Sequence, residues 1–208
     1  MPYNLTSLHL RPICDHWAAR ASVGGVIVPS GAETAPLALT VGGITALWIN
    51  VTAQDNATYL AYTVAVYRPF SHVCDLIGLT HDAVGAPAAA LQPAFDHATL
   101  TYHMSVAGGV STMRFFPTPL ETTTSILVNG LPTPGGGPSS AVAIVMGGTT
   151  TVVVRATAQD GVTSRNYVVL VYRPSQIADL ADIQVRSCST LEALQPSTLT
   201  PPTKAREA

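Results

Sequence analysis

The stretch TVVVRATAQDGVTSRNYVVLVYRP (151–174) decides the fold. Apolar and polar residues alternate on both sides of Asp160-Gly161, and such alternation is typical of half-buried strands. An Asp-Gly pair between two alternating runs is a strong signal for a β-hairpin. We therefore predict strands over 149–158 and 164–173. The side chains expected to face inward are Val152, Val154, Ala156, Tyr167, Val169 and Val171.

Short strands are predicted upstream of this hairpin as well, with turn signals between them. Residues 131–140, rich in Gly and Pro, are predicted to form a surface loop. Seven short strands within about 100 residues favour a two-sheet sandwich. No segment has an apolar stripe of helical spacing and length, so the expected fold class is all-β. The five upstream strands are expected at 75–80, 100–106, 111–116, 124–128 and 141–146.

The closing hairpin occurs twice. Residues 41–69 align without a gap with residues 146–174 at an offset of 105, and 14 of the 29 aligned positions are identical. The shared segments include TAQD and VYRP. This period is too long for a solenoid repeat and matches the size of a whole domain. The sequence therefore contains a duplicated structural unit.

The limits of the repeat set the expected domain boundaries. The similar segments CDLIGL (74–79) and ADLADI (178–183) follow the two YRP motifs, and both are expected to be first strands. We predict a sandwich lacking its first strand at 1–70, a complete sandwich at 75–174, and the start of a third unit at 175–208. This division aligns Tyr3 with Tyr102. The Pro-rich tail is expected to be disordered. The whole chain is expected to be a fragment of a longer array.

The first unit is expected to differ from the second at its edge. Without its first strand it would expose an unpaired sheet edge, or a preceding strand outside this chain would complete it.

Composition excludes two classes of partner. Hydrophobic residues make up 47% of the chain, charged residues 11%, and the net charge is −2. Without a basic stripe the chain lacks the electrostatic attraction that drives nucleic-acid binding. No basic amphipathic helix and no apolar run of membrane-spanning length is present, so no membrane contact is expected within this chain.

The unit at 75–173 resembles the cadherin-like β-sandwich domain that occurs in tandem in large surface proteins of algae and bacteria. The motifs that carry the resemblance are DLIGLT, LQPAFDHATLTYHMSV, ILVNG, a GG turn and the valine-rich closing hairpin. The ending Tyr-x-Val-x-Val-x-Arg is present at 167–173 and again at 62–68, although Asn56 replaces the turn glycine of the first copy. The resemblance implies tandem immunoglobulin-like or cadherin-like sandwiches, used as extracellular spacers or adhesion modules rather than as catalysts.

No catalytic, cofactor or metal site is predicted. The chain has no G-x-S-x-G elbow, no phosphate-binding glycine loop before a helix, and only scattered carboxylates. True cadherins bind calcium through clustered acidic residues, whereas Asp75 and Asp179 stand nearly alone. The six histidines do not pair with other ligands at metal-binding spacing.

Candidate modification sites come from three Asn-x-Thr sequons at Asn4, Asn50 and Asn56. Asn50 alternates with inward positions and is expected to point outward, and Asn56 is expected in a turn. Both placements suit glycans on a secreted protein, and the alternative is coincidence in a Thr-rich chain.

The cysteines leave several arrangements open. Buried or unpaired thiols, one disulfide with a leftover thiol, and bridges to missing chain are all compatible with their spacing. The three residues are Cys14, Cys74 and Cys188.

The leading functional hypothesis is a non-catalytic structural and adhesive segment of a secreted or cell-surface repeat protein. Its partners would be neighbouring domains of the same longer chain, and surface glycans or other surface proteins, contacted through loops such as 86–92 and 131–140. A carbohydrate-binding accessory module beside an enzyme is the alternative, with Trp48 as the candidate ligand-contact aromatic. An enzyme with a loop-built site is the third hypothesis. The aromatic side chains considered for stacking on sugars are Trp17, Trp48, Phe115 and Phe116.

Overall fold

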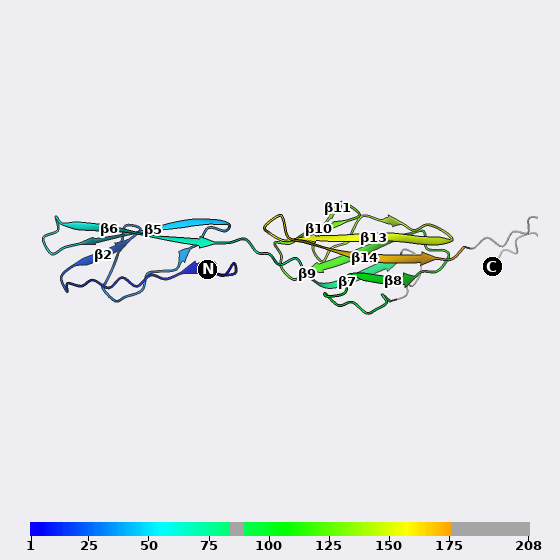
Figure 1. Cartoon of the computed structure of the whole chain (residues 1–208), viewed down its shortest axis with the longest axis horizontal. Helices are drawn as coiled ribbons and strands as arrows, with labels where there is room; N and C mark the ends of the chain where they lie inside the picture. The colour runs from blue at the N-terminus through cyan, green and yellow to red at the C-terminus, as the bar shows by residue number, and fades with distance from the viewer. Residues whose placement is uncertain (84–89, 176–208) are drawn as a thin grey trace, which may run out of the picture. The chain divides into compact units, whose positions relative to one another are not determined.

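The computed structural model describes residues 1–83 and 90–175, and every regular element in those residues is a β-strand (Figure 1). The predicted all-β fold class is confirmed. Residues Met1–Ser175 form one compact unit, and within it the strands fall into two sets, each pairing only within itself. We call residues 1–70 the N-terminal β region and residues 71–175 the C-terminal sandwich, and describe each by itself.

The C-terminal sandwich has two sheets. Its hairpin strands β13 (Gly148–Thr157) and β14 (Ser164–Arg173) pair antiparallel over their full length. On its other side, β14 pairs in parallel with β8 (Thr101–Ser105). The sheet orders are β11-β10-β13-β14-β8 and β12-β9-β7. The remaining strands are β7 (Leu76–Ala83), β9 (Thr112–Pro119), β10 (Ser125–Val128), β11 (Leu131–Thr133) and β12 (Val142–Ala143).

The core of the sandwich lies between these two sheets. Successive strand residues point to opposite faces, and the alternation in the closing hairpin correctly predicts which ones are buried. Full burial of a valine side chain stabilises the fold by about 1.5–3 kcal/mol. The predicted inward residues Val152, Val154, Ala156, Tyr167, Val169 and Val171 all have 0% exposed surface.

The N-terminal β region has fewer strands and a much smaller core. Its sheets have the orders β3-β2-β5-β6 and β1-β4, so β6 is an edge strand. Its buried apolar cluster consists of Leu39, Leu47 and Val66, with five partly buried residues against it. The strands are β1 (Ser7–Leu8), β2 (Arg20–Val23), β3 (Val26–Val28), β4 (Leu37–Ala38), β5 (Gly43–Thr52) and β6 (Tyr59–Arg68).

Every strand of the N-terminal β region has a counterpart 105 residues later. The hairpin β5–β6 corresponds to β13–β14, and β1 to the first residues of β9. Side-chain hydrogen bonds repeat as well, since Arg68 Nε donates to the Tyr3 carbonyl (2.9 Å) and Arg173 Nε donates to the Gly108 carbonyl (2.8 Å). The repeated sequence therefore encodes a repeated structure.

The hairpin turns show how one substitution between the copies is tolerated. Asn56 (φ 57°) and Gly161 (φ 72°) occupy the same left-handed position, which asparagine adopts more readily than most residues. In both turns the preceding aspartate accepts hydrogen bonds from the hydroxyl and N–H of a threonine three residues on, Asp55 from Thr58 and Asp160 from Thr163. The missing turn glycine in the first copy thus leaves the turn unchanged.

The N-terminal β region lacks more than was predicted. It contains counterparts of β9 to β14, but none of its residues corresponds to β7 or β8. Two strands are therefore missing from 1–70, rather than the single first strand. The sequence alignment of Tyr3 with Tyr102 causes the error, because the offset of 105 places Tyr3 opposite Gly108.

The strand predictions for the C-terminal sandwich differ from the structure at β11 and at β12. The predicted loop 131–140 begins with β11, which pairs with β10 through Ile126↔Thr133 and Val128↔Leu131. Pro132 hides this strand in the sequence, but proline is tolerated on an edge strand, where its missing N–H is not needed. The predicted strand at 141–146 is confined to β12.

The segment 71–74 is bound to the hairpin turn of the C-terminal sandwich. Ser71 is 2% exposed, its N–H donates to Gln159 Oε1 (3.1 Å), and its carbonyl accepts the Asp160 N–H (3.2 Å). His72 Nδ1 lies 2.8 Å from Asp160 Oδ2. The start of the sandwich is thereby held beside the turn that precedes β14.

This turn predicts a pH dependence of stability. The Thr163 hydroxyl, His72 and the Val162 N–H, in that order, hold the pKa of Asp160 far below its usual value. Because the pKa of Asp160 is lower in the folded state, its ionised carboxylate stabilises the fold at pH values above the pKa of an unfolded carboxyl, about 3.9. This contribution is lost as the pH falls below that value. We expect Asp160→Asn to reduce the dependence of the urea midpoint on pH between about 4 and 2. An unchanged dependence would contradict this role, and Asp55→Asn is the matched control without a histidine contact.

Some predictions lie outside the described residues. They are the third unit from residue 176 onward, its disordered tail, Cys188, and most of the loop 86–92. The division into separate domains also stays a prediction.

Candidate functional site

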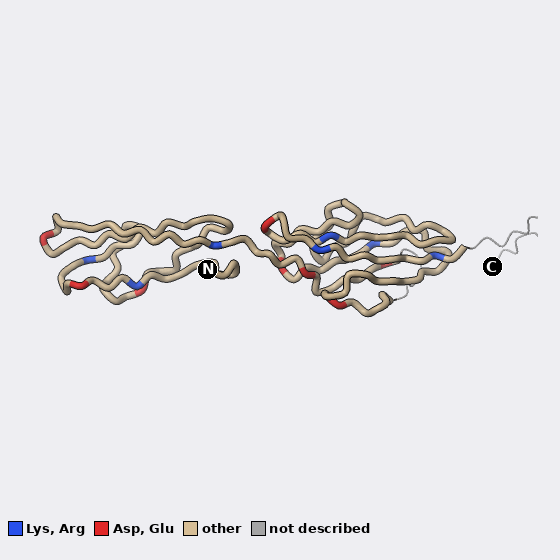
Figure 2. Tube along the Cα trace, in the orientation of Figure 1, with Lys and Arg blue, Asp and Glu red and all other residues tan. Residues whose placement is uncertain are grey.

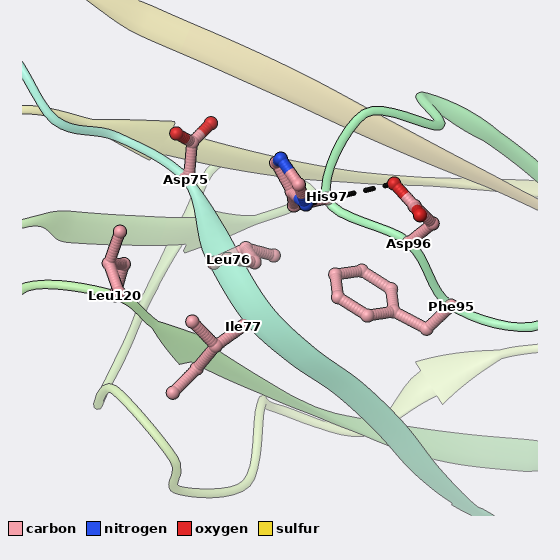
Figure 3. A pocket seen from close by; sticks show the side chains of 7 residues that line it. All are labelled: Asp75, Leu76, Ile77, Phe95, Asp96, His97 and Leu120. Carbon is pink, nitrogen blue, oxygen red and sulfur yellow. Dashed lines mark ion pairs between the residues drawn. The ribbon is translucent and has the colours of Figure 1, made fainter.

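A hollow of about 450 Å³ lies beside the start of β7 and is the candidate binding site (Figure 3). Figure 3 shows Asp75 and Leu76 on one side, with Asp96 and His97 on the segment that precedes β8 on the other. Two large apolar side chains of the lining are exposed, Ile77 by 60% and Leu120 by 54%. The lining consists of Asp75, Leu76, Ile77, Phe95, Asp96, His97 and Leu120.

The charge of Asp75 is compensated within the fold. Its Oδ1 lies 2.5 Å from Arg165 Nη1 at the start of β14, and about a third of each side chain is exposed, 31% and 36%. The same guanidinium donates to the His97 carbonyl at 3.1 Å. A hydrogen bond with Tyr167 and the charge of Asp75 both raise the pKa of Arg165. Asp75 therefore joins β7 to β14 electrostatically and is not a free carboxylate.

Two buried tyrosines fix the segment that carries Asp96 and His97. The Tyr102 hydroxyl donates to the Asp96 carbonyl at 2.5 Å, and burial raises the pKa of Tyr102. The Tyr167 hydroxyl donates to the His97 carbonyl at 3.3 Å and accepts the Leu76 N–H at 3.1 Å. The Asp96 carboxylate accepts the N–H of Ala98 at 2.8 Å, which caps its own turn.

This arrangement suits apolar contact better than chemistry. The Asp75 carboxylate is engaged by Arg165, and the Asp96 carboxylate is engaged by its own turn and lies 3.7 Å from His97 Nδ1. Apart from His97, the remaining walls are Leu, Ile and Phe side chains. In residues 1–83 and 90–175 no group of three or more His, Cys, Asp or Glu side chains is placed to hold a metal ion. A nucleophile with an adjacent base, which covalent catalysis needs, does not line the hollow.

A second exposed surface lies on the outer face of the N-terminal β region. Trp48 is 60% exposed there, as its alternation with inward residues predicts. Ile44 and Tyr67 form a directly opposed pair on the same face and are 67% and 55% exposed. Exposed apolar and aromatic side chains thus lie at two places on this face, at Trp48 and at the Ile44–Tyr67 pair four residues away along β5.

The other aromatic candidates behave differently. Phe115 has 0% exposed surface and belongs to the core, so its proposed role in stacking on a sugar is wrong. Phe116, the next residue on β9, is half-buried, because neighbouring strand residues face opposite sides. Trp17 is 86% exposed and stacks on His16 with ring centroids 5.8 Å apart.

All three sequon asparagines, Asn4, Asn50 and Asn56, are exposed. Asn50 lies on the outer face of β5, two residues from Trp48, and Asn56 lies in the hairpin turn. Their use as glycosylation sites stays a prediction.

The described cysteines are free thiols. Cys14 is half-buried, and Cys74 is buried at 6% exposure, which raises the pKa of its thiol. These placements of Cys14 and Cys74 agree with buried or unpaired thiols.

Charged side chains are spread thinly over the described chain. Figure 2 shows few acidic and basic residues along the described trace, and the basic ones form no continuous stripe. In the described residues no helix has the length and apolarity needed to cross a bilayer.

Sequence reasoning missed the hollow and its ion pair. Asp75 and Arg165 are 90 residues apart, and no short-range pattern links them. Tyr67 was detectable, because its place in the alternation of β6 puts it on the same outer face as Trp48.

Comparison with known proteins identifies part of the chain. Residues 79–174 match the family model of the cadherin-like beta sandwich domain. The sequence resemblance is thus confirmed for one domain, and the tandem arrangement rests on the internal repeat.

The other two comparisons add little. A search of curated proteins found no match. Among solved structures the chain is similar to Clostridium thermocellum CbhA fibronectin(III)-like modules, with 11% identity, a TM-score of 0.28, and coverage of 86% of this chain and 91% of that chain. A TM-score this low supports no inference about this chain.

Proposed function

We propose that this chain is a non-catalytic structural segment of a secreted or cell-surface protein, built from tandem cadherin-like modules. The observation that carries the proposal is the repetition of strands, turns and arginine hydrogen bonds at a constant offset of 105 residues. Selection for a site would be expected to make the copies diverge at a few reactive side chains, whereas here the shared residues hold the scaffold. The family match over residues 79–174 supports the same class of function.

The location of the protein tests this proposal. Antibodies raised against the C-terminal sandwich should label intact producing cells or their secreted matrix, and protease added outside should remove the signal. A signal that appears only after the cells are permeabilised would refute the proposal.

Glycosylation provides an independent prediction. Asn50 and Asn56 are exposed and lie on a strand face and in a turn, where a glycan would not disturb the core. We expect intact-glycopeptide mass spectrometry of the native protein to find carbohydrate on both. Unmodified asparagine at both positions would contradict the prediction, and Asn129, which is not part of a sequon, is the internal control.

Carbohydrate binding is a second candidate function, favoured by the exposed side chain of Trp48. The exposed indole face of Trp48 offers an aromatic surface on which a sugar ring can stack. A glycan array separates the candidates, since binding lost in Trp48→Ala and kept in Trp17→Ala supports the accessory-module hypothesis. Absence of binding by the unmodified chain removes it.

A further inference from the structure

The inner side of β6 is uncovered, although its sequence is that of a core strand. Tyr62 is 51% exposed and Leu60 is 63% exposed, whereas Tyr167, the counterpart of Tyr62, has 0% exposed surface. The register places Tyr62 and Leu60 on the same face as the buried Val66, because alternate residues share a face. Side chains that are core residues in one copy are therefore at the surface in the other.

The C-terminal sandwich shows what covers this face. There β8 pairs in parallel with β14, with Tyr102 opposite Val169 and Met104 opposite Val171. The Val168 N–H donates to the Leu100 carbonyl at 2.7 Å. β7 closes the opposite sheet by pairing with β9. The buried side chains supplied by the described residues of this segment, 74–83 and 90–106, are Cys74, Leu76, Leu79, Ala83, Leu91, Tyr102, Met104 and Val106.

The segment 75–105 also provides hydrogen-bond partners for the Tyr167 hydroxyl, and the N-terminal β region has no such segment beside Tyr62. The Tyr167 hydroxyl accepts the Leu76 N–H and donates to the His97 carbonyl, and both partners lie in the segment 75–105. Tyr62 offers the same hydroxyl at the corresponding position of β6. A bare apolar face, an unpaired strand edge and an aromatic hydroxyl thus coincide on one side of the N-terminal β region.

We propose that the N-terminal β region is a strand-acceptor site, and that its occupant is a two-strand segment of the β7–β8 type, of which residues 75–105 are the example in this chain. One strand adds in parallel along β6, and the other adds antiparallel along residues 8–14, the counterpart of the part of β9 that pairs with β7. Added strands gain affinity from main-chain hydrogen bonds, and alternate side chains entering pockets give specificity.

The register defines the occupant residue by residue. At the offset of 105, a tyrosine corresponding to Tyr102 lies opposite Val64, and a methionine corresponding to Met104 lies opposite Val66. One mismatch is electrostatic, because Leu60 replaces Arg165 and removes the partner of Asp75. The acceptor therefore selects the apolar pattern of the segment and not its first carboxylate.

The test adds the segment to the full chain. Since Met1 corresponds to Val106, residues 75–105 are fused directly before Met1, and exposed tyrosines are nitrated and assigned by mass spectrometry. We expect nitration of Tyr62 to fall by at least about tenfold as it becomes buried like Tyr167. Tyr59 and Tyr67 face the outer side of β6 and should react as before, which makes them internal controls.

A matched chimera carries Leu76→Asp and Tyr102→Asp in the added segment only. Charges at these two positions cannot be buried, so Tyr62 should react as in the unmodified chain. The same segment supplied as a free peptide should slow amide exchange across residues 59–68, and the aspartate-bearing peptide should not.

Three results would overturn the proposal. Unchanged nitration of Tyr62 in the chimera would show that the segment does not cover the face. Equal protection by the aspartate-bearing segment would show coverage without strand docking. Protection of Tyr62 in the unmodified chain that rises with concentration, and that the peptide does not displace, would assign the face to self-association of copies.

Discussion

Replacing Tyr167 with alanine is expected to lower the free energy of unfolding of the C-terminal sandwich by about 3–5 kcal/mol, the usual cost of truncating a buried aromatic residue. The side chain has no exposed surface, packs against Phe95 with ring centroids 6.1 Å apart, and hydrogen-bonds to β7 and to the segment before β8. Its removal opens a cavity and leaves the Leu76 N–H without its partner. Urea unfolding measures the decrease in the free energy of unfolding, and amide exchange in β14 measures it locally.

The repeat supplies the control for this prediction. Tyr62 occupies the equivalent position in β6 but is half exposed, so Tyr62→Ala should cost less than about 1 kcal/mol. Equal losses in the two hairpins would mean that the inner face of β6 is covered in the unmodified chain, contrary to the structure described above.

Replacing Arg173 with methionine is expected to destabilise the C-terminal sandwich by about 2–4 kcal/mol, since hydrogen bonds to charged groups each contribute about 1.5–3 kcal/mol and removing a buried charge offsets part of the loss. Arg173 is 7% exposed, and its guanidinium donates to the carbonyls of Gly108 (2.8 Å) and Ile144 (2.9 Å). Methionine has a similar length but no donor, so both carbonyls lose their partner. The shift of the urea midpoint at constant slope reports the change.

Arg68 is the matched site for this second prediction. Its two hydrogen bonds are equivalent, but one is longer, at 3.3 Å to the Leu39 carbonyl, and the side chain is only half-buried. We expect Arg68→Met to cost about half as much or less. Arg173→Lys should lie in between, because an ammonium lacks the planar fork that reaches both carbonyls. A larger loss at Arg68 than at Arg173 would contradict the dependence on burial.

The closing hairpin was predictable because its information is local. Alternation specifies which residues of β13 and β14 face inward, Asp160 and Gly161 mark the turn, and the repeat shows that the same hairpin occurs twice. The edge strands of the sheets were less predictable. β11 contains Pro132 and β12 is only two residues long, so their pairing depends on neighbouring strands rather than on their own sequence.

The candidate site was not predictable from the sequence for a related reason. The contact of Asp75 with Arg165 and the hydrogen bond from the Tyr167 hydroxyl to the His97 carbonyl join segments that are far apart in the chain. No periodicity encodes such contacts. The outward position of Trp48, in contrast, follows from the alternation of a single strand.

The attachment of Ser71 and His72 beside the turn before β14 has a mechanical consequence. The chain enters the sandwich at the end where β14 begins and leaves it at Arg173, where β14 ends. Tension applied through the chain therefore acts along the axis of β14, which is paired with β13 on one side and with β8 on the other. Both ladders are loaded in shear, so their hydrogen bonds must fail together instead of opening one after another from an end.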